Sequence, residues 1–108
     1  MNPNLHRLLC ELEDFGQRND SEVSRDDRAH RMLNISRDTG EFLGVLIRAT
    51  QAQRVLEIGT SNGYSTLWLG WAARAVGGHV TTVELAPYKI EMARVNVARA
   101  DMDDVITQ

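Results

Sequence analysis

The feature that most constrains this chain is a short apolar run that ends in an acid and a glycine turn. Residues 55–58 read Val-Leu-Glu-Ile, and Gly59 and Gly63 then frame a Gly-x-x-x-Gly turn that opens a helical pattern. Glycine has no Cβ and adopts positive φ at little cost, so a strand can turn tightly here into a helix whose free N–H groups point at whatever lies above. The segment therefore predicts a strand-to-helix ligand site that suits a small molecule with a negatively charged end.

Strand and helix patterns alternate from this run to the end of the chain. β-Branched residues predict a second strand, and Pro87 stands where a helix can begin without losing a hydrogen bond. Such alternation is the signature of a parallel sheet built from right-handed crossovers, so the predicted fold class is α/β. We expect strands at residues 55–58 and 80–84, the start of a third at 105–108, and helices at about 63–76 and 87–100.

The first half of the chain is predicted to be helical. Leucines recur at helical spacing over residues 4–17, and Gly16 is expected to end this first helix before a polar loop. A second helix is expected over about 36–50. It is predicted to bury four apolar side chains, Phe42, Leu43, Leu46 and Ile47. We therefore divide the chain into an N-terminal helical segment, 1–50, and a sheet-containing domain, 51–108.

Composition and charge narrow the function classes. With 43% hydrophobic and 25% charged residues, the 108 residues have the composition of one soluble globular domain. The net charge is −3 and the basic residues are scattered, so nucleic acid is not indicated as a partner. A single Cys10, no signal peptide and no apolar run of about 18 residues predict a cytoplasmic protein without membrane spans. The three histidines share no ligand spacing, so no metal site is expected among them.

Two carboxylates, Glu57 and Glu84, stand at the ends of the first two expected strands. Because the carboxyl ends of parallel strands meet at one edge of a sheet, both are expected to point toward the crevice where open α/β sheets bind ligands. An acid after the second strand is placed to accept hydrogen bonds from both hydroxyls of a ribose. Glu84 follows Gly63 at close to the roughly 20-residue spacing typical of such acids.

The glycine pattern separates the possible nucleotide ligands. A triphosphate loop needs Gly-Lys-Ser/Thr, but Gly63 is followed by Tyr64 and Ser65. A nicotinamide-dinucleotide site is disfavoured because Ser61 occupies the middle glycine position and Glu57 would lie near the pyrophosphate. An adenosine ligand that carries an amino acid, such as S-adenosylmethionine, suits both the acids and the helix N–H groups.

These residues resemble a known family. The pattern Glu57-x-Gly59-x-x-x-Gly63-Tyr64-Ser65, followed by Thr-Val-Glu at 82–84, is similar to the cofactor half of class I S-adenosylmethionine-dependent O-methyltransferases, in the catechol and caffeoyl-CoA O-methyltransferase-like family. Upstream, residues 32–43 resemble the family's segment over the bound methionine moiety. The resemblance implies a partial Rossmann-like fold, N-terminal helices plus a parallel β-α-β-α-β half-sheet.

The resemblance also implies roles for individual residues. Glu57 and the Gly59–Gly63 turn would contact the amino-acid end of the cofactor, Ser65 its carboxylate, and Glu84 the ribose, while Ile35 would touch the cofactor near the transferred methyl. The cofactor-binding residues that it implies are Ile35, Glu57, Gly59, Thr60, Ser61, Gly63, Ser65, Glu84 and Leu85.

Family members continue through further strands that carry the metal-binding carboxylates and the catalytic lysine. Magnesium is expected for the full-length family, but its ligands are not in this chain, and no catalytic residue is assigned. Lys89, the only lysine, is expected to face solvent. The strand at 55–58 would lack one neighbour, so we expect a truncated product or a homodimer or other self-association that covers the edge.

The leading function is an O-methyltransferase that transfers a methyl group to a hydroxyl of a small phenolic acceptor, here truncated and without its catalytic half. One alternative is a non-catalytic module for adenosine-ligand binding or oligomerisation. Another is methylation of a tRNA hydroxyl, which some relatives of this family perform and the weak basic character disfavours.

Overall fold

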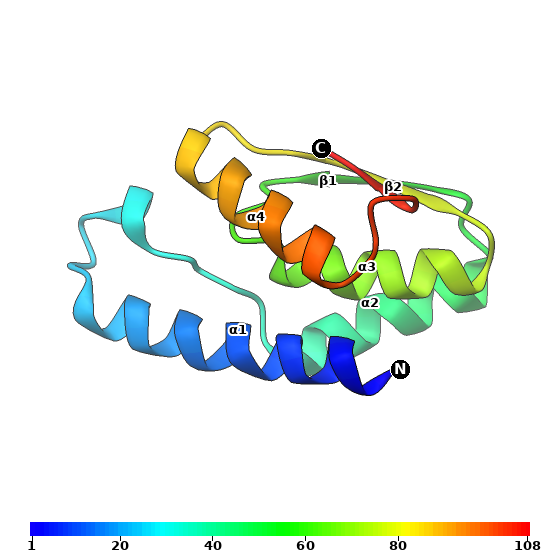
Figure 1. The fold of residues 1–108 in the computed structure, drawn as a ribbon, viewed down its shortest axis with the longest axis horizontal. Helices are drawn as coiled ribbons and strands as arrows, with labels where there is room; N and C mark the ends of the chain where they lie inside the picture. The colour runs from blue at the N-terminus through cyan, green and yellow to red at the C-terminus, as the bar shows by residue number, and fades with distance from the viewer.

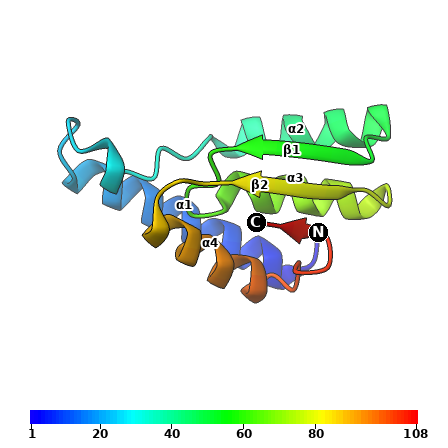
Figure 2. The same ribbon diagram turned by 90° about the horizontal axis from the view of Figure 1, so that it is seen from above.

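A parallel sheet of three strands carries the helices of this protein on one side, in a computed structural model that describes all residues from Met1 to Gln108 (Figure 1, Figure 2). Along the chain the elements are α1 (Pro3–Glu22), the short 3-10 helix η1 (Arg28–His30), α2 (Arg37–Thr50), β1 (Arg54–Ile58), α3 (Tyr64–Ala75), β2 (His79–Val83), α4 (Pro87–Arg99) and β3 (Ile106–Thr107). The predicted alternation of strands and helices is therefore confirmed.

The strand order is β1-β2-β3, and both pairings are parallel. β1 pairs with β2 along its whole length, from Arg54 opposite His79 to Ile58 opposite Val83. This register brings the carboxyl ends of β1 and β2 level with each other. β1 lies at the edge of the sheet, with β2 as its only neighbour.

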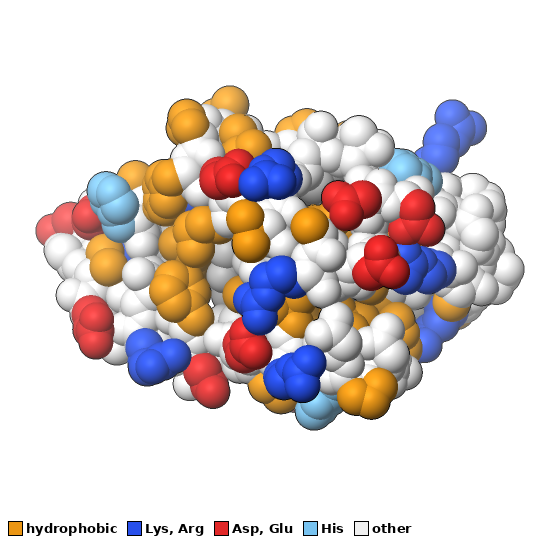
Figure 3. Space-filling view, in the orientation of Figure 1, with side chains coloured by type: hydrophobic (Ala, Val, Ile, Leu, Met, Phe, Trp, Pro, Cys, Tyr) orange, Lys and Arg blue, Asp and Glu red, His pale blue; other side chains and the backbone are white.

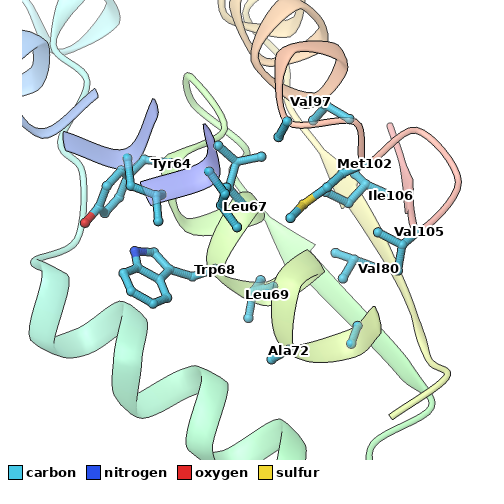
Figure 4. Close-up of a cluster of buried hydrophobic side chains, with 14 of the residues drawn as sticks. Tyr64, Leu67, Trp68, Leu69, Ala72, Val80, Val97, Met102, Val105 and Ile106 are labelled. Carbon is cyan, nitrogen blue, oxygen red and sulfur yellow. The ribbon is translucent and has the colours of Figure 1, made fainter. Parts of the chain in front are cut away.

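The hydrophobic core lies between the sheet and the helices. Leu9 of α1 and Leu67 of α3 are both fully buried. Figure 4 shows α3 side chains, including Trp68, facing inward, and Met102 and Ile106 packed on Leu67 from the end of the chain. Burying each large apolar side chain contributes about 1.5–3 kcal/mol, so this cluster fixes α3 under the sheet.

Gly16 does not end the first helix. α1 continues through it to Glu22, and the predicted polar loop begins later. Gly16 is buried, and a Cβ there would lie only 2.8 Å from Nδ2 of Asn34. The glycine therefore permits close contact between α1 and the segment before α2, and this contact outweighs its weak helix propensity.

α2 packs through its glycines rather than through all of its large side chains. Gly40 and Gly44 are buried, and a Cβ on Gly40 would lie 2.4 Å from Cδ1 of Trp68 on α3. Ile47 is buried as predicted. Phe42 and Leu46 are not, since their exposed fractions are 59% and 42%. The small residues let two helix backbones approach, which turns the bulkier side chains outward.

On α4, Ala93 and Val97 are buried, but Ile90 is exposed. Lys89, expected in solvent, is buried with an exposed fraction of 8%. Its role is described with the candidate site below.

One face of the sheet carries no helix. Leu56 and Ile58 of β1 and Val83 of β2 point toward it, and Ile58 has an exposed fraction of 76%. The open face continues to the free edge of β1.

Charged side chains of both signs are interspersed on the face shown in Figure 3. This distribution agrees with the scattered basic residues of the sequence. None of the helices is both long enough and apolar enough to cross a membrane.

Candidate functional site

The Gly59–Gly63 turn joins the carboxyl end of β1 to α3. Both glycines have positive φ, +93° and +92°. The N–H groups of Gly59 and Thr60 donate to the Val83 carbonyl at 2.8 and 3.1 Å, which ties the turn to the end of β2. A Cβ on Gly59 would meet no atom within 4 Å, whereas one on Gly63 would lie 3.4 Å from α4. The first glycine thus leaves free space over the turn, and the second lets α4 approach.

Glu57 is the centre of a hydroxyl cluster beneath this turn. Its carboxylate accepts hydrogen bonds from Ser65 Oγ at 2.5 Å, Thr66 Oγ1 at 2.5 Å and Thr82 Oγ1 at 2.8 Å. Thr82 Oγ1 also lies 2.5 Å from Thr60 Oγ1. The carboxylate therefore connects β1, β2 and the first turn of α3. Charge-assisted bonds of this kind are roughly twice as strong as neutral ones.

Glu84 lies just beyond β2 and is held by backbone N–H groups. Its carboxylate accepts from Ser61 N at 2.7 Å, Leu85 N at 3.0 Å and Ala86 N at 3.1 Å. Partial burial by itself would raise the pKa of Glu84, but these three bonds and the nearby charge of Lys89 outweigh it, and the pKa lies below its ordinary value. Glu84 is therefore a fixed anion at neutral pH.

A hollow of 350 Å³ lies at the carboxyl ends of β1 and β2. It is lined by Ile58, Gly59, Val83, Glu84 and Leu85. Its walls are mostly apolar, and Glu84 is its single charged group. This is the position at which open α/β sheets bind ligands.

Residues 28–36, which we call the strap, consist of η1 and the segment that connects it to α2. Ser61 Oγ donates to the Met32 carbonyl at 2.8 Å, which joins the strap to the glycine turn. Ile35 of the strap is half-buried. It lines a second, polar hollow of 440 Å³ together with Glu13, Gly16, Gln17, Asp20, Asn34, Ser36 and Arg37.

The structure brings most of the predicted site residues together. Gly59, Glu84 and Leu85 share one hollow, whereas Glu57 and Ser65 are hydrogen-bonded to each other beside it. Thr60, Ser61 and Gly63 form the turn between these groups. Ile35 faces the other hollow.

Sequence reasoning missed the two threonines that bind Glu57. Thr82 and the buried Val80 are two residues apart in β2, so their side chains point to the same face of the sheet, the face that the helices cover. In the register of β1 and β2, Thr82 lies opposite Glu57. Thr66 lies one residue after Ser65 in the first turn of α3. A search for hydroxyls facing the first acid would have found Thr82.

The only lysine is part of the site rather than of the solvated surface. Lys89 Nζ donates to the Arg31 carbonyl of the strap at 2.7 Å. Its aliphatic stem is buried, and its charge acts on Glu84.

No group of three or more histidine, cysteine, aspartate or glutamate side chains is close enough to hold a metal ion.

Comparison with known proteins decides the family. The sequence matches the O-methyltransferase family over residues 6–108. The chain belongs to the O-methyltransferase family. Within this O-methyltransferase chain, the matched region contains the strap, the glycine turn and both acids.

Similar proteins show which fold this chain shares in part. A catechol O-methyltransferase of Mycobacterium tuberculosis (strain ATCC 25618 / H37Rv) is 50% identical over 74 residues, which are 67% of this chain and 32% of that protein. The O-methyltransferase from Bacillus cereus in complex with SAH superposes with a TM-score of 0.73 at 30% identity, over 94% of this chain and 41% of that one. TomG from Streptomyces achromogenes, in complex with SAM, gives a TM-score of 0.71 at 28% identity, over 100% and 42%.

These neighbours confirm the predicted Rossmann-like fold, present in part. The O-methyltransferase chain spans about a third of the length of the curated relative and about two fifths of the solved ones.

Proposed function

We propose that this chain is the S-adenosylmethionine-binding part of an O-methyltransferase that methylates a hydroxyl of a small phenolic acceptor. The observation that carries the proposal is the hollow at the carboxyl ends of β1 and β2, where a fixed carboxylate, Glu84, stands beside open glycine backbone. Two solved relatives are complexes with SAH and SAM, and a curated relative is a catechol O-methyltransferase, which supports the proposal.

Glu84 has the acceptor capacity that a ribose requires. Oε2 accepts two N–H bonds, from Leu85 and Ala86, and Oε1 accepts one, from Ser61. A carboxylate oxygen has about two lone-pair directions, so Oε1 keeps one for a ligand hydroxyl. The three backbone bonds hold the carboxylate in place before the ligand arrives, which lowers the ordering cost of binding.

The amino-acid end of the cofactor would lie near Glu57 and Ser65. The anionic Glu57 favours the ligand's ammonium, and the N–H groups at the start of α3 favour its carboxylate. In this structure Ser65 donates to Glu57. To donate to the ligand's carboxylate, the Ser65 hydroxyl has to rotate away from Glu57.

The reaction itself is an in-line displacement. When bound, S-adenosylmethionine would supply the methyl group: its bond from sulfur to methyl carbon would break as the acceptor oxygen bonds to that carbon, which would leave a neutral thioether and release the hydroxyl proton to water. The contribution of this chain would be to orient the methyl donor. In intramolecular model reactions, correct orientation of the reacting groups accelerates the reaction strongly.

Calorimetric titration with SAM, SAH and NAD tests the proposal. We expect heat of binding with both sulfur ligands and none with NAD. Glu84→Ala should weaken SAH binding by roughly 1–3 kcal/mol, because it removes a charged acceptor. Glu91→Ala is the matched control, since Glu91 lies on the neighbouring helix and pairs only with Arg94 on the surface. Binding of NAD without either sulfur ligand would refute the proposal.

We also propose that this chain self-associates. β1 offers an unpaired edge, and Leu56 and Ile58 extend it into an open apolar face. Exposed edges of this kind pair readily with other chains. Light scattering after size-exclusion chromatography should give at least twice the mass of one chain. A monomer that unfolds cooperatively would contradict this.

The second candidate function is a non-catalytic adenosine-binding module. The hollow and the fixed Glu84 carboxylate would serve this function as well, since it requires only binding. Methyl transfer to catechol, measured with this chain alone, separates the two, because a binding module takes up SAH without turnover.

A further inference from the structure

The middle of the strap is held mainly by side chains from other parts of the fold. Within residues 29–33 the carbonyls of Ala29, His30, Arg31 and Met32 all accept bonds from side chains, and the N–H groups of Met32 and Leu33 donate to one. The donors and acceptors come from α1, α4 and the glycine turn. They are Asn19, Asp20, Ser61, Tyr88 and Lys89. Residues 31–33, which follow η1 and form no helix or strand, are thus held by hydrogen bonds from three other parts of the fold.

Asp20 holds the strap from the α1 side. Its two carboxylate oxygens accept the N–H groups of Met32 at 2.7 Å and Leu33 at 2.8 Å. Leu33 has a φ of 52°, in the left-handed region that side chains rarely adopt. Such a conformation persists only where its surroundings enforce it, and strained residues of this kind occur at ligand clamps. Asp20 supplies the enforcement.

Lys89 holds the strap from the α4 side. Its Nζ donates to the Arg31 carbonyl at 2.7 Å, one residue before the two N–H groups that Asp20 accepts. The charge of Lys89 also favours the ionised form of Glu84, whose carboxylate accepts the Ser61 N–H group at 2.7 Å. Ser61 Oγ in turn donates to the Met32 carbonyl of the strap. Lys89 therefore holds the strap directly, and Ser61 joins the strap to the glycine turn and Glu84.

We propose that Asp20 and Lys89 are positioning residues that clamp the strap from opposite sides and so fix its backbone against the glycine turn of the proposed cofactor site. The inference rests on the proposed function for its ligand, S-adenosylmethionine or its product. Neither residue touches the hollow lined by Glu84. Each acts through the strap's backbone, so its loss should weaken cofactor binding by loosening the strap.

Four variants and two matched controls test this. Asp20→Asn and Lys89→Met break one clamp each, and Lys89→Arg keeps a cationic donor that can reach the carbonyl. Asp14→Asn on α1 and Arg94→Met on α4 remove the same charges at exposed positions without a bond to the strap. Asp20→Asn combined with Lys89→Met reports whether both residues act through one element. The readouts are hydrogen exchange of the strap amides and the Kd of SAH by calorimetry.

We expect exchange over residues 29–35 to accelerate, and SAH affinity to fall by about tenfold, in Asp20→Asn and Lys89→Met, while the controls match the wild type. Lys89→Arg should keep most of the SAH affinity and most of the protection of the strap amides from exchange. The SAH affinity of the double variant should fall by less than the product of the two single fold-losses, because either substitution alone already loosens the strap.

Exchange in either single variant that stays at the wild-type rate would overturn the clamp, even if affinity falls. Faster exchange with unchanged SAH affinity would show that the clamp does not serve the cofactor. A wild-type chain that binds no SAH would refute the proposed function instead, and strap exchange would then decide the clamp by itself.

Discussion

Thr82 of β2 stands directly opposite Glu57 of β1 and donates a 2.8 Å hydrogen bond to its carboxylate. Thr82 is fully buried and lies 2.5 Å from Thr60 Oγ1. A threonine has one hydroxyl proton, so when Thr82 donates to Glu57, Thr60 must be the donor to Thr82. The buried Thr82 hydroxyl thus connects Glu57 of β1 to Thr60 of the glycine turn through two hydrogen bonds.

Replacing this hydroxyl should cost stability. Thr82→Val keeps the shape of the side chain but leaves Thr60 and one Glu57 oxygen short of a partner. The free energy of unfolding should fall by about 1–3 kcal/mol, measured by urea denaturation at unchanged m-value. Thr81→Val, at the exposed neighbouring position, should change it by less than about 0.5 kcal/mol. Equal effects of the two substitutions would show that these two hydrogen bonds are not stabilising.

The parts of this fold that could be predicted are those specified by local pattern. The apolar run, the two glycines and the acid fix β1, the turn and the start of α3, and Glu84 makes two of its three backbone bonds to the residues that follow it. Parallel pairing then brings Glu57 and Glu84 to the same edge of the sheet. These inferences need only neighbours in sequence and one topological rule.

The parts that could not be predicted depend on distant partners. Lys89 is buried because its ammonium reaches the Arg31 carbonyl, 58 residues away in sequence. Gly16 remains inside α1 because Asn34 packs on it, although glycine costs about 1 kcal/mol in a helix. In both cases the local pattern is typical of a different structure, and a tertiary contact reverses it.

The two glycines of α2 should respond to alanine in opposite directions. A Cβ at position 40 would lie 2.4 Å from Trp68, whereas at Gly44 the nearest atom, from Trp71, is 3.6 Å away. Gly40→Ala should lower stability by about 1–3 kcal/mol through overpacking. Gly44→Ala should raise it by up to about 1 kcal/mol, since alanine has the better helix propensity. Thermal unfolding of both variants checks the signs, and two shifts of the same sign would contradict this packing.

Stability should fall in acid partly through Asp20. Partial burial raises its pKa, but bonds from the Met32 and Leu33 N–H groups and from Asn19, with the charge of Arg31, outweigh burial and lower it below the ordinary value. A carboxylate with a lowered folded-state pKa contributes stability above its unfolded pKa of about 3.9, and this is lost as the pH falls through the folded value.

Asp20→Asn should therefore flatten the decline in unfolding free energy between about pH 5 and pH 2. Urea midpoints measured across that window check it. Asp14→Asn, which removes a carboxylate without a hydrogen-bond partner in α1, is the control. A slope in Asp20→Asn as steep as in the wild type would mean that the strap bonds do not perturb this carboxylate.

Gly59 and Gly77 allow backbone strain to be separated from a role in the site. Both have positive φ, +93° and +72°, and a Cβ on either would meet no atom within 4 Å. Alanine at each should thus cost a similar amount of stability, about 1–2 kcal/mol, from the backbone conformation alone.

Gly59, however, lines the hollow beside Glu84, whereas Gly77 lies beyond the far end of α3. The space beside Gly59 is the space that the proposed cofactor would occupy. Gly59→Ala should therefore lose more than about tenfold in SAH affinity, and Gly77→Ala should bind as the wild type does at a temperature where both variants are folded. If both variants lose stability equally and both keep their affinity, the cofactor does not lie against the glycine turn.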